Sequence, residues 1–338
     1  MRLLAAMSGG VDSSVAAALL VEEGHDVTGV TLRLWDNPTD AGCCSVAEID
    51  DARQVANVLG IDHLVWTFVD EFDARVVSPY VEAHAEGLTP NPCIECNRHL
   101  KFGRLLRRAA QLGFDAVATG HHARVVGGRL LRGVDAQKDQ SYVLYVLGPA
   151  ELARVRFPVG VMTKAEVRAK AAALRLPTAA KPDSQDVCFV TTSGGREALL
   201  SSRIPLHAGR VVDTAGAEVG RVDAVELVTV GQRRGLGTGG GARRYALAVD
   251  PAAGTVTVGE AGDLLVDSVA LTQLCWVGGE PFTGPVEAQS SAHGDAVAAT
   301  FDGTTVHFAE PQRRVAPGQS VVLYRGEEVL GGGIAAHL

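Results

Sequence analysis

The chain has 338 residues, of which 46% are hydrophobic and 21% charged, so it can bury one large core or divide into two or three domains. Its net charge of −8 argues against binding to nucleic acid through overall positive charge, although local basic patches remain compatible with it. The N-terminal apolar run is too short for a secretory signal, and no segment approaches the ~18 apolar residues of a membrane span. The sequence therefore predicts a cytoplasmic protein without membrane association.

Strands and helices alternate in the first half of the chain. An apolar segment leads into SGGVDSS, which is followed by a helical pattern that ends near Gly24. A capping box formed by Ser45 and Glu48 begins a second helical pattern, which ends at Gly60. The predicted strands cover residues 2–7, 27–34, 63–69 and 115–120. This alternation predicts an α/β fold with a doubly wound parallel sheet, whose ligands bind outside the carboxyl ends of the strands.

The pattern changes after about residue 200. Short β-rich runs such as RVVDT, AVELVTV, RYALAVD and TVTVGE follow one another, separated by Gly, Pro and Asp. Turn dipeptides at 302–303 and 317–318 continue this pattern toward the C-terminus. We expect a nucleotide-binding and catalytic domain at 1–200, a small β domain at 201–260 and a β-barrel at 261–338.

SGGVDSS predicts an anion-binding loop. A glycine-rich turn between a strand and a helix presents backbone N–H groups at the helix N-terminus, where phosphate binds well. The chain contains no Gly-Lys pair, so a Walker A loop is excluded and transfer of a γ-phosphate is disfavoured. A loop that instead binds a departing pyrophosphate would leave the α-phosphate open to attack, which is the chemistry of adenylation. A second glycine pattern, GLGTGG at 235–240, precedes a strand-like segment and is interpreted as an ordinary loop.

Three of the six cysteines occur in segments that suggest chemistry. Cys93 and Cys96 follow two prolines and precede a helical pattern, with basic residues close to Cys96 that would favour its thiolate. Cys188 lies in a strand-like segment, DVCFV, where a small core residue is the simpler interpretation. The residues alone leave both interpretations of Cys188 open.

SGGVDSS is the signature of the PP-loop ATP pyrophosphatases. Together with six further blocks in order along the chain, it closely resembles the bacterial tRNA-specific 2-thiouridylases. The blocks are TPNPCIECNRHLKF, TGHHARV, KDQSYVLY, KPDSQDVCF, TVGQRRGLG and PGQSVVLY. The resemblance implies a PP-loop domain, and ATP-dependent 2-thiolation of the wobble uridine of tRNA, with release of AMP and pyrophosphate.

The resemblance also implies the roles of individual residues. ATP, with Mg²⁺, would be bound around Ala6, Met7, Ser8, Gly9, Gly10, Val11, Asp12, Ser13, Leu32 and Gly120. Cys188 would accept sulfur from a donor protein as a persulfide, and Cys96 would act as the second nucleophile. The tRNA would contact Asn91, Pro92, Cys93, His121, Lys138, Asp139, Gln140 and Gln319.

Two departures from the family pattern keep alternatives open. Many members carry an acidic residue where this chain has Cys93, so Cys93, Cys96 and Cys188 could instead bind three irons of a [4Fe-4S] cluster. A zinc site is disfavoured because it would need four nitrogen or sulfur ligands. The nearest candidates besides these three cysteines are only His99 and Cys43 or Cys44. The barrel segment QSSAHG at 289–294 lacks the arginine and tyrosine that often contact RNA there.

Other interpretations concern the RNA-binding face and the function. Arg104, Arg107 and Arg108 share one helical face, which would suit RNA phosphates or simply solvent.

An amide-forming synthetase of the same superfamily would need no paired thiols. A module that binds RNA or senses redox state through a cluster would show no ATP-dependent change to RNA.

Overall fold

The computed structural model describes residues 1–35, 46–183, 187–190, 194–239 and 243–337. Its first half forms a parallel sheet in the order β3-β2-β1-β4-β7. The five strands are β1 (Arg2–Ala6), β2 (Asp26–Arg33), β3 (Asp62–Thr67), β4 (Ala116–Ala118) and β7 (Val155–Arg156). Four of them lie within the ranges predicted from the sequence to within a residue or two, which confirms the α/β parallel-sheet fold.

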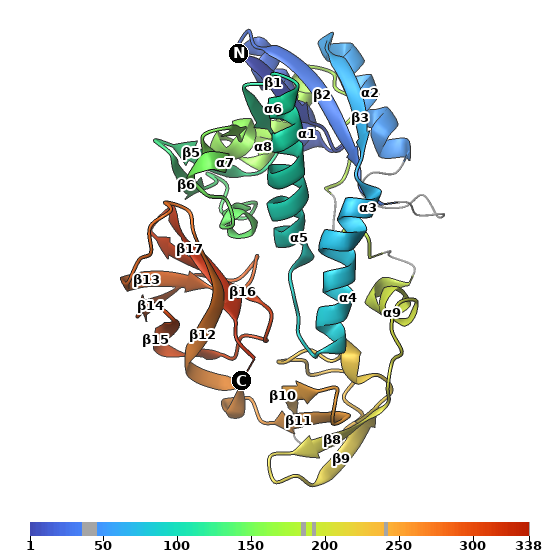
Figure 1. Cartoon of the computed structure of the whole chain (residues 1–338), viewed down its shortest axis with the longest axis vertical. Coiled ribbons are helices and arrows are strands. Elements are labelled where there is room, and N and C mark those ends of the chain that lie inside the picture. The colour runs from blue at the N-terminus through green and yellow to red at the C-terminus, as the bar shows by residue number, and fades with distance from the viewer. Residues whose placement is uncertain (36–45, 184–186, 191–193, 240–242, 338) are drawn as a thin grey trace.

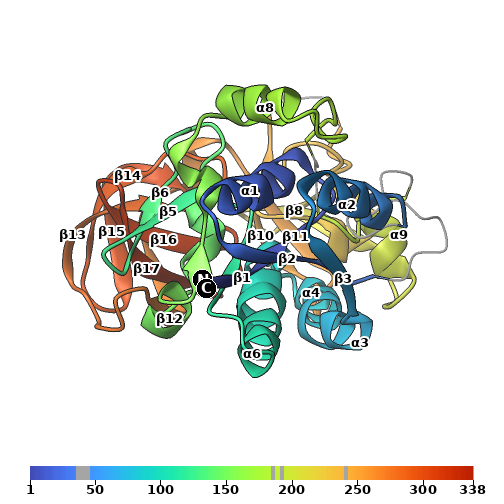
Figure 2. The ribbon, with the colours of Figure 1, turned by 90° about the horizontal axis from the view of Figure 1, so that it is seen from above.

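Helices cover both faces of this sheet (Figure 2). On one face lie α1 (Val11–Glu22), α2 (Val46–Leu59) and α8 (Lys164–Ala173), and on the other α3 (Val69–Phe72), α4 (Ser78–Ala85) and α6 (Leu105–Gln111). Successive side chains of a strand point to opposite faces. Leu3 and Ala5 accordingly pack into the core beneath α1 and α2, while Leu4 packs into the core on the α4 and α6 side. Gly24 and Gly60 end α1 and α2 with positive φ angles, as the sequence predicts.

The helix predicted after the two prolines is continuous but irregular. It comprises α5 (Pro92–Glu95), the π-helical segment η2 (Cys96–Arg104) and α6, and it runs from the sheet toward the β domains (Figure 1). π-Helical segments occur frequently at functional sites. The sequence gives no signal for the wider turn, because hydrophobic spacing over so few residues does not separate α from π geometry.

The second half is β-rich. A small sheet in the order β10-β11-β8-β9 contains β8 (Gly209–Asp213), β9 (Glu218–Val222), β10 (Tyr245–Asp250) and β11 (Thr255–Gly259). The prediction of a strand in AVELVTV is wrong, because Val225–Leu227 forms a 3₁₀ turn. Val225 and Val228 are buried side by side in the small core instead of alternating between two faces. GLGTGG belongs to no helix over its described residues and leads toward strand β10, as expected of a loop.

The C-terminal strands form a closed six-stranded antiparallel barrel. Strands pair in the order β12-β15-β14-β13-β16-β17, and β12 pairs with β17 to close it. They are β12 (Leu265–Trp276), β13 (Gly284–Gln289), β14 (Val297–Phe301), β15 (Thr305–Arg313), β16 (Ser320–Arg325) and β17 (Glu328–Ala335). The turns predicted at 302–303 and 317–318 join β14 to β15 and β15 to β16.

The barrel sheet continues into the first half of the chain. The hairpin of β5 (Ala123–Val126) and β6 (Arg129–Arg132) adds to it through pairing of Leu131 with Glu328.

Domain boundaries near 200 and 260 stay a prediction. Within the described residues, no helix is both long and apolar enough to cross a membrane.

A buried histidine of α4 predicts how stability depends on pH. His84 is 3% exposed, its Nδ1 lies 2.9 Å from the Tyr80 carbonyl, and its Nε2 has no hydrogen-bond partner among the described residues. Burial lowers its pKa to about 4 from the usual 6.5, so below pH 6.5 the unfolded chain takes up a proton that the folded chain does not. We expect the free energy of unfolding to lose about 2 kcal/mol between pH 7 and pH 5 from this group alone.

Urea unfolding at the two pH values checks this expectation. The His84→Leu variant, which cannot titrate at this position, should show a correspondingly smaller pH dependence than the wild type. Equal pH dependence in both proteins would contradict the assignment.

Candidate active site

The glycine loop, residues 8–13, follows β1 at the carboxyl edge of the parallel sheet and includes the first turn of α1. Gly9 adopts φ +73°, and a Cβ there would lie 2.5 Å from the Glu48 carbonyl oxygen. Gly10 is the N-cap of α1, with no side chain to occupy the first N–H groups of the helix. An anion can therefore approach the N-terminus of α1 directly.

Hydroxyl groups maintain the shape of the glycine loop. Ser13 Oγ accepts a hydrogen bond from Ser8 N at 3.1 Å and donates to the Gly10 carbonyl at 3.0 Å. Ser14 Oγ also donates to Gly10 O, at 2.8 Å, and accepts from Thr178 at 3.0 Å. These bonds are internal to the protein, so the backbone N–H groups remain the principal donors that the loop offers to a ligand.

The other residues predicted to border the nucleotide lie at the ends of neighbouring strands. Ala6 ends β1, Leu32 is buried near the end of β2, and Gly120 follows β4. A Cβ on Gly120 would lie 2.5 Å from Ser13 N, so only glycine lets these two segments come so close. Met7, just before the glycine loop, and Val11, within it, are both buried. The fold thus brings the predicted nucleotide-binding residues together along one edge.

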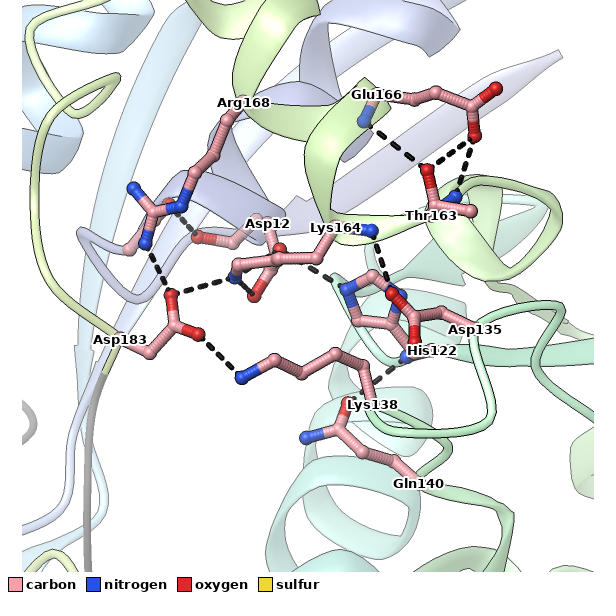
Figure 3. Close-up of polar contacts among 12 residues, drawn as sticks. Asp12, His122, Asp135, Lys138, Gln140, Thr163, Lys164, Glu166, Arg168 and Asp183 are labelled. Carbon is pink, nitrogen blue, oxygen red and sulfur yellow. Dashed lines mark hydrogen bonds and ion pairs between the residues drawn. The ribbon is translucent and has the colours of Figure 1, made fainter.

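An ionic network that the sequence analysis missed lies beside the glycine loop (Figure 3). Lys164 Nζ contacts both carboxylate oxygens of Asp12, at 2.8 and 2.7 Å, and Asp183 Oδ1 at 2.9 Å. His122 Nε2 lies 3.1 Å from Asp12 Oδ1. Asp183 also contacts Arg168 at 2.6 Å and Lys138 at 2.7 Å.

The network is a charged, partly buried cluster. Burial opposes ionisation of Asp12, but hydrogen bonds from His122 and Lys164 outweigh it and lower the pKa of Asp12. Desolvation likewise opposes ionisation of Asp183, yet Lys138 and Lys164 hold its pKa well below the usual range. Both carboxylates are ionised at neutral pH. Three cationic side chains, Lys138, Lys164 and Arg168, contact these two carboxylates.

Local sequence places Lys164 at the start of α8. Thr163 and Glu166 form a reciprocal capping box, with Glu166 Oε2 accepting from Thr163 N at 2.7 Å, and the Lys164 N–H donates to Asp135 at 2.9 Å. The T-K-x-E pattern is visible in the sequence and predicts a helix start. It does not reveal that this helix start faces the glycine loop, more than 150 residues earlier in the chain.

A second lysine approaches the loop from the other side. Lys181 Nζ donates to the Gly9 carbonyl at 3.0 Å and to Asp51 Oδ2 at 2.6 Å, and lies 3.7 Å from Glu48. The segment before Cys188 is thereby attached to both the glycine loop and α2. Lys181 and Asp183 belong to the block KPDSQDVCF, but the sequence analysis singled out only Cys188 from this block.

The first predicted tRNA-contacting residues begin the long helix. Asn91 is the N-cap of α5, and its Oδ1 accepts from Cys93 N at 3.0 Å. Pro92 occupies the first helical turn, where its missing N–H costs nothing. The Pro317 carbonyl accepts from Thr89 N at 2.8 Å, so the barrel turn that carries Gln319 lies against the segment leading to Asn91.

The second group of predicted tRNA-contacting residues adjoins His122. Gln140 and His122 exchange two hydrogen bonds, at 3.0 and 2.9 Å. Asp139 is largely buried and accepts bonds from Arg132 and from Gly133 N, so it organises the loop. His121 is buried, and burial keeps its pKa well below 6.5. Of this group, Lys138 is the most exposed charged side chain.

The predicted catalytic cysteines differ in their surroundings. Cys96 is buried at the first position of η2, and Cys188 is partly buried against the same large apolar core. The prediction of a strand around Cys188 is wrong over its described residues. Val190 N donates a hydrogen bond to the Val187 carbonyl, which forms a turn. Phe189 fixes this turn by packing edge-on against Phe72.

The iron–sulfur alternative, with Cys93, Cys96 and Cys188 as ligands, stays a prediction. Within the part of the chain that the structure describes, no three His, Cys, Asp or Glu side chains gather as a metal-binding group. Cys96 is buried in the apolar core, Cys188 is partly buried against the same core, and Cys93 is exposed. Cys43 and Cys44, considered for zinc, and Ser45 of the expected capping box lie outside the described residues.

The arginine face of the long helix is partly used for packing. Arg104 pairs with Glu71 at 3.4 Å, and the guanidinium of Arg108 lies 4.5 Å from the centre of the Trp66 ring. These contacts support a structural role on the sheet side for two of the three arginines.

A parallel sheet with a glycine loop at its carboxyl edge is followed by a small β sheet and a closed barrel. This arrangement defines a PP-loop nucleotide-binding protein with two β appendages. Three family models match in the same order. Residues 1–192 match the tRNA methyl transferase HUP domain, residues 197–260 the tRNA methyl transferase PRC-barrel domain, and residues 266–335 the aminomethyltransferase beta-barrel domain.

Curated relatives match along nearly the whole chain. The tRNA-specific 2-thiouridylase MnmA of Chloroflexus aurantiacus is 48% identical over 98% of this chain and 97% of its own length. That of Mycolicibacterium smegmatis is 48% identical over 98% of both chains. The chain therefore belongs to the tRNA-specific 2-thiouridylase family.

Solved structures resemble part of the chain. The U34-tRNA thiolase NcsA from Methanococcus maripaludis, with its [4Fe-4S] cluster, is 19% identical, with a TM-score of 0.37, over 59% of this chain and 64% of that one. A 4-thiouridine synthetase in an RNA complex with bound ATP is 18% identical, with a TM-score of 0.36, over 55% of this chain and 44% of that one.

Proposed function

We propose that this protein uses ATP to replace O2 of the wobble uridine of tRNA with sulfur. The observation that carries the proposal is the 48% identity to a tRNA-specific 2-thiouridylase over 98% of the chain. The lysine-rich edge beside the glycine loop and the absence of a Walker A lysine support adenylation over phosphate transfer.

Activation of the uridine comes first, because a uracil carbonyl oxygen is a poor leaving group. O2 attacks the α-phosphorus of ATP, and the bond to the β-phosphate breaks to release pyrophosphate. The N–H groups at the start of α1 and the ammonium of Lys164 would stabilise the charge that develops on pyrophosphate. The Asp12 carboxylate, in the first turn of α1, would contribute to binding a Mg²⁺ ion, which would neutralise phosphate charge.

Sulfur transfer follows at the activated carbon. Cys188 carries a persulfide received from a donor protein, and its terminal sulfur attacks C2 as AMP departs. The Cys96 thiolate then attacks Cys188 Sγ and breaks the S–S bond, which leaves sulfur on C2 and forms a Cys96–Cys188 disulfide. In an alternative order, Cys96 attacks the persulfide first and releases sulfide beside the activated base. A cellular thiol reduces the disulfide in both orders.

The tRNA would lie across the segments that surround the start of the long helix. Asn91, Pro92 and Cys93 would border the flipped base, and Gln319 would contact RNA from the barrel turn that packs on Thr89. Lys138 would contact a backbone phosphate. His121, Asp139 and Gln140 would shape this surface from beneath.

Incubation of the purified protein with unmodified tRNA, ATP, Mg²⁺ and a persulfide donor tests the proposal. We expect 2-thiouridine in the digested tRNA by nucleoside mass spectrometry, together with stoichiometric AMP and pyrophosphate. Omission of ATP should abolish it. ATP consumption without change to tRNA would instead favour another synthetase of the superfamily.

A further inference from the structure

The carboxylate of Asp183 contacts three cations from two separate segments (Figure 3). Oδ1 lies 2.9 Å from Lys164 Nζ and 2.6 Å from Arg168 Nη2, both on α8. Oδ2 lies 2.7 Å from Lys138 Nζ, on the loop before Gln140. One carboxylate thus joins the helix that faces the glycine loop to the loop that faces the predicted RNA surface.

The two lysines have different environments. Lys164 is 13% exposed and also contacts Asp12 of the glycine loop, so a polyphosphate bound at α1 would compete with Asp183 for its ammonium group. Lys138 is 41% exposed, and Asp183 is the carboxylate within ion-pair distance of it among the described residues. An RNA phosphate would compete with Asp183 for this second ammonium group.

The competition has a predictable sign. A polyphosphate beside Lys164 removes one cation from Asp183 and repels its carboxylate, because like charges in a partly buried site interact strongly. Repulsion of Asp183 weakens its pair with Lys138 and leaves that lysine available for an RNA phosphate. An RNA phosphate at Lys138 favours nucleotide binding in the same way, since coupling between two binding sites is reciprocal.

We propose that Asp183 is a shared counter-ion that makes nucleotide binding and tRNA binding mutually favourable. The inference rests on the proposed function, because it takes ATP and tRNA as the two polyanions. Asp183 then neutralises the charge of Lys138 in the ligand-free protein, and this charge becomes available to an RNA phosphate once nucleotide is bound.

Fluorescence anisotropy of labelled tRNA, with and without a non-hydrolysable ATP analogue and Mg²⁺, measures this coupling. In the wild type we expect nucleotide to tighten tRNA binding about five- to tenfold. In Asp183→Asn, tRNA should bind tightly without nucleotide, and nucleotide should change its Kd by less than about twofold. Glu22→Gln is the matched control, because Glu22 pairs with Lys170 of the same helix α8 at 2.7 Å, at the other end of α1 from the glycine loop. It should retain the wild-type coupling.

Lys138→Gln provides a second, surface-exposed variant that tests the same link without altering Asp183. It should bind nucleotide within about twofold of the wild type and bind tRNA weakly whether nucleotide is present or not.

Three outcomes would overturn the inference. Nucleotide and tRNA binding that are independent in the wild type, coupling that persists in Asp183→Asn, or weaker binding of both ligands by that variant would each show that Asp183 is not a shared counter-ion. If the wild type binds neither ligand, the proposed function is wrong as well.

Discussion

Replacement of Cys188 by serine should lower formation of 2-thiouridine by roughly 10³-fold or more, because serine cannot carry the sulfane sulfur that the proposed reaction transfers. ATP-dependent release of pyrophosphate in the presence of tRNA should persist, since the glycine loop and its lysines are untouched. Nucleoside mass spectrometry and a pyrophosphate assay on the same reactions separate the two half-reactions.

The Cys96→Ser variant distinguishes the two orders of sulfur transfer. If the persulfide attacks C2 first, the tRNA remains linked to Cys188 through an S–S bond, and a covalent complex that a thiol reductant cleaves should accumulate. If Cys96 releases sulfide first, adenylated tRNA should accumulate instead. Cys275→Ser, a partly buried cysteine of the barrel strand β12, should leave thiolation unchanged. Unimpaired thiolation in both Cys96→Ser and Cys188→Ser would contradict the mechanism.

Lys164→Gln should lower kcat/KM for ATP by roughly 10²- to 10³-fold, because it removes the ammonium group closest to Asp12 at the mouth of the glycine loop. The loss should appear in pyrophosphate release as well as in thiolation. This joint loss separates the variant from Cys188→Ser, in which only thiolation fails.

Lys170→Gln is the control for this substitution. Lys170 belongs to the same helix and forms a comparable pair with Glu22, but its partly exposed position limits the contribution of the pair to about 1 kcal/mol or less. Its kcat/KM should stay within about twofold of the wild type. Equal losses in the two variants would mean that α8 is merely destabilised and that Lys164 has no specific role at the loop.

The sequence by itself determined the elements whose signals are local. Alternating strands and helices, the helix stops at Gly24 and Gly60, and the turns of the barrel all depend on residues close together in the chain. The glycine loop was recognisable for the same reason, since a strand, two glycines and a helix N-terminus are consecutive. Resemblance to a family then added the roles of Cys96 and Cys188 and the RNA-contacting residues.

Only the tertiary structure decided which distant side chains meet. Asp12, His122, Lys164 and Asp183 come from four segments, and their ion pairs exist because parallel strands and the start of α8 meet at one edge of the sheet. The turn at Cys188 and the 3₁₀ turn at Val225 also escaped prediction, because packing of Phe189 and Val225 into cores outweighs local strand propensity. Hydrophobic periodicity is a property of neighbours in sequence, whereas a charged cluster is a property of neighbours in space.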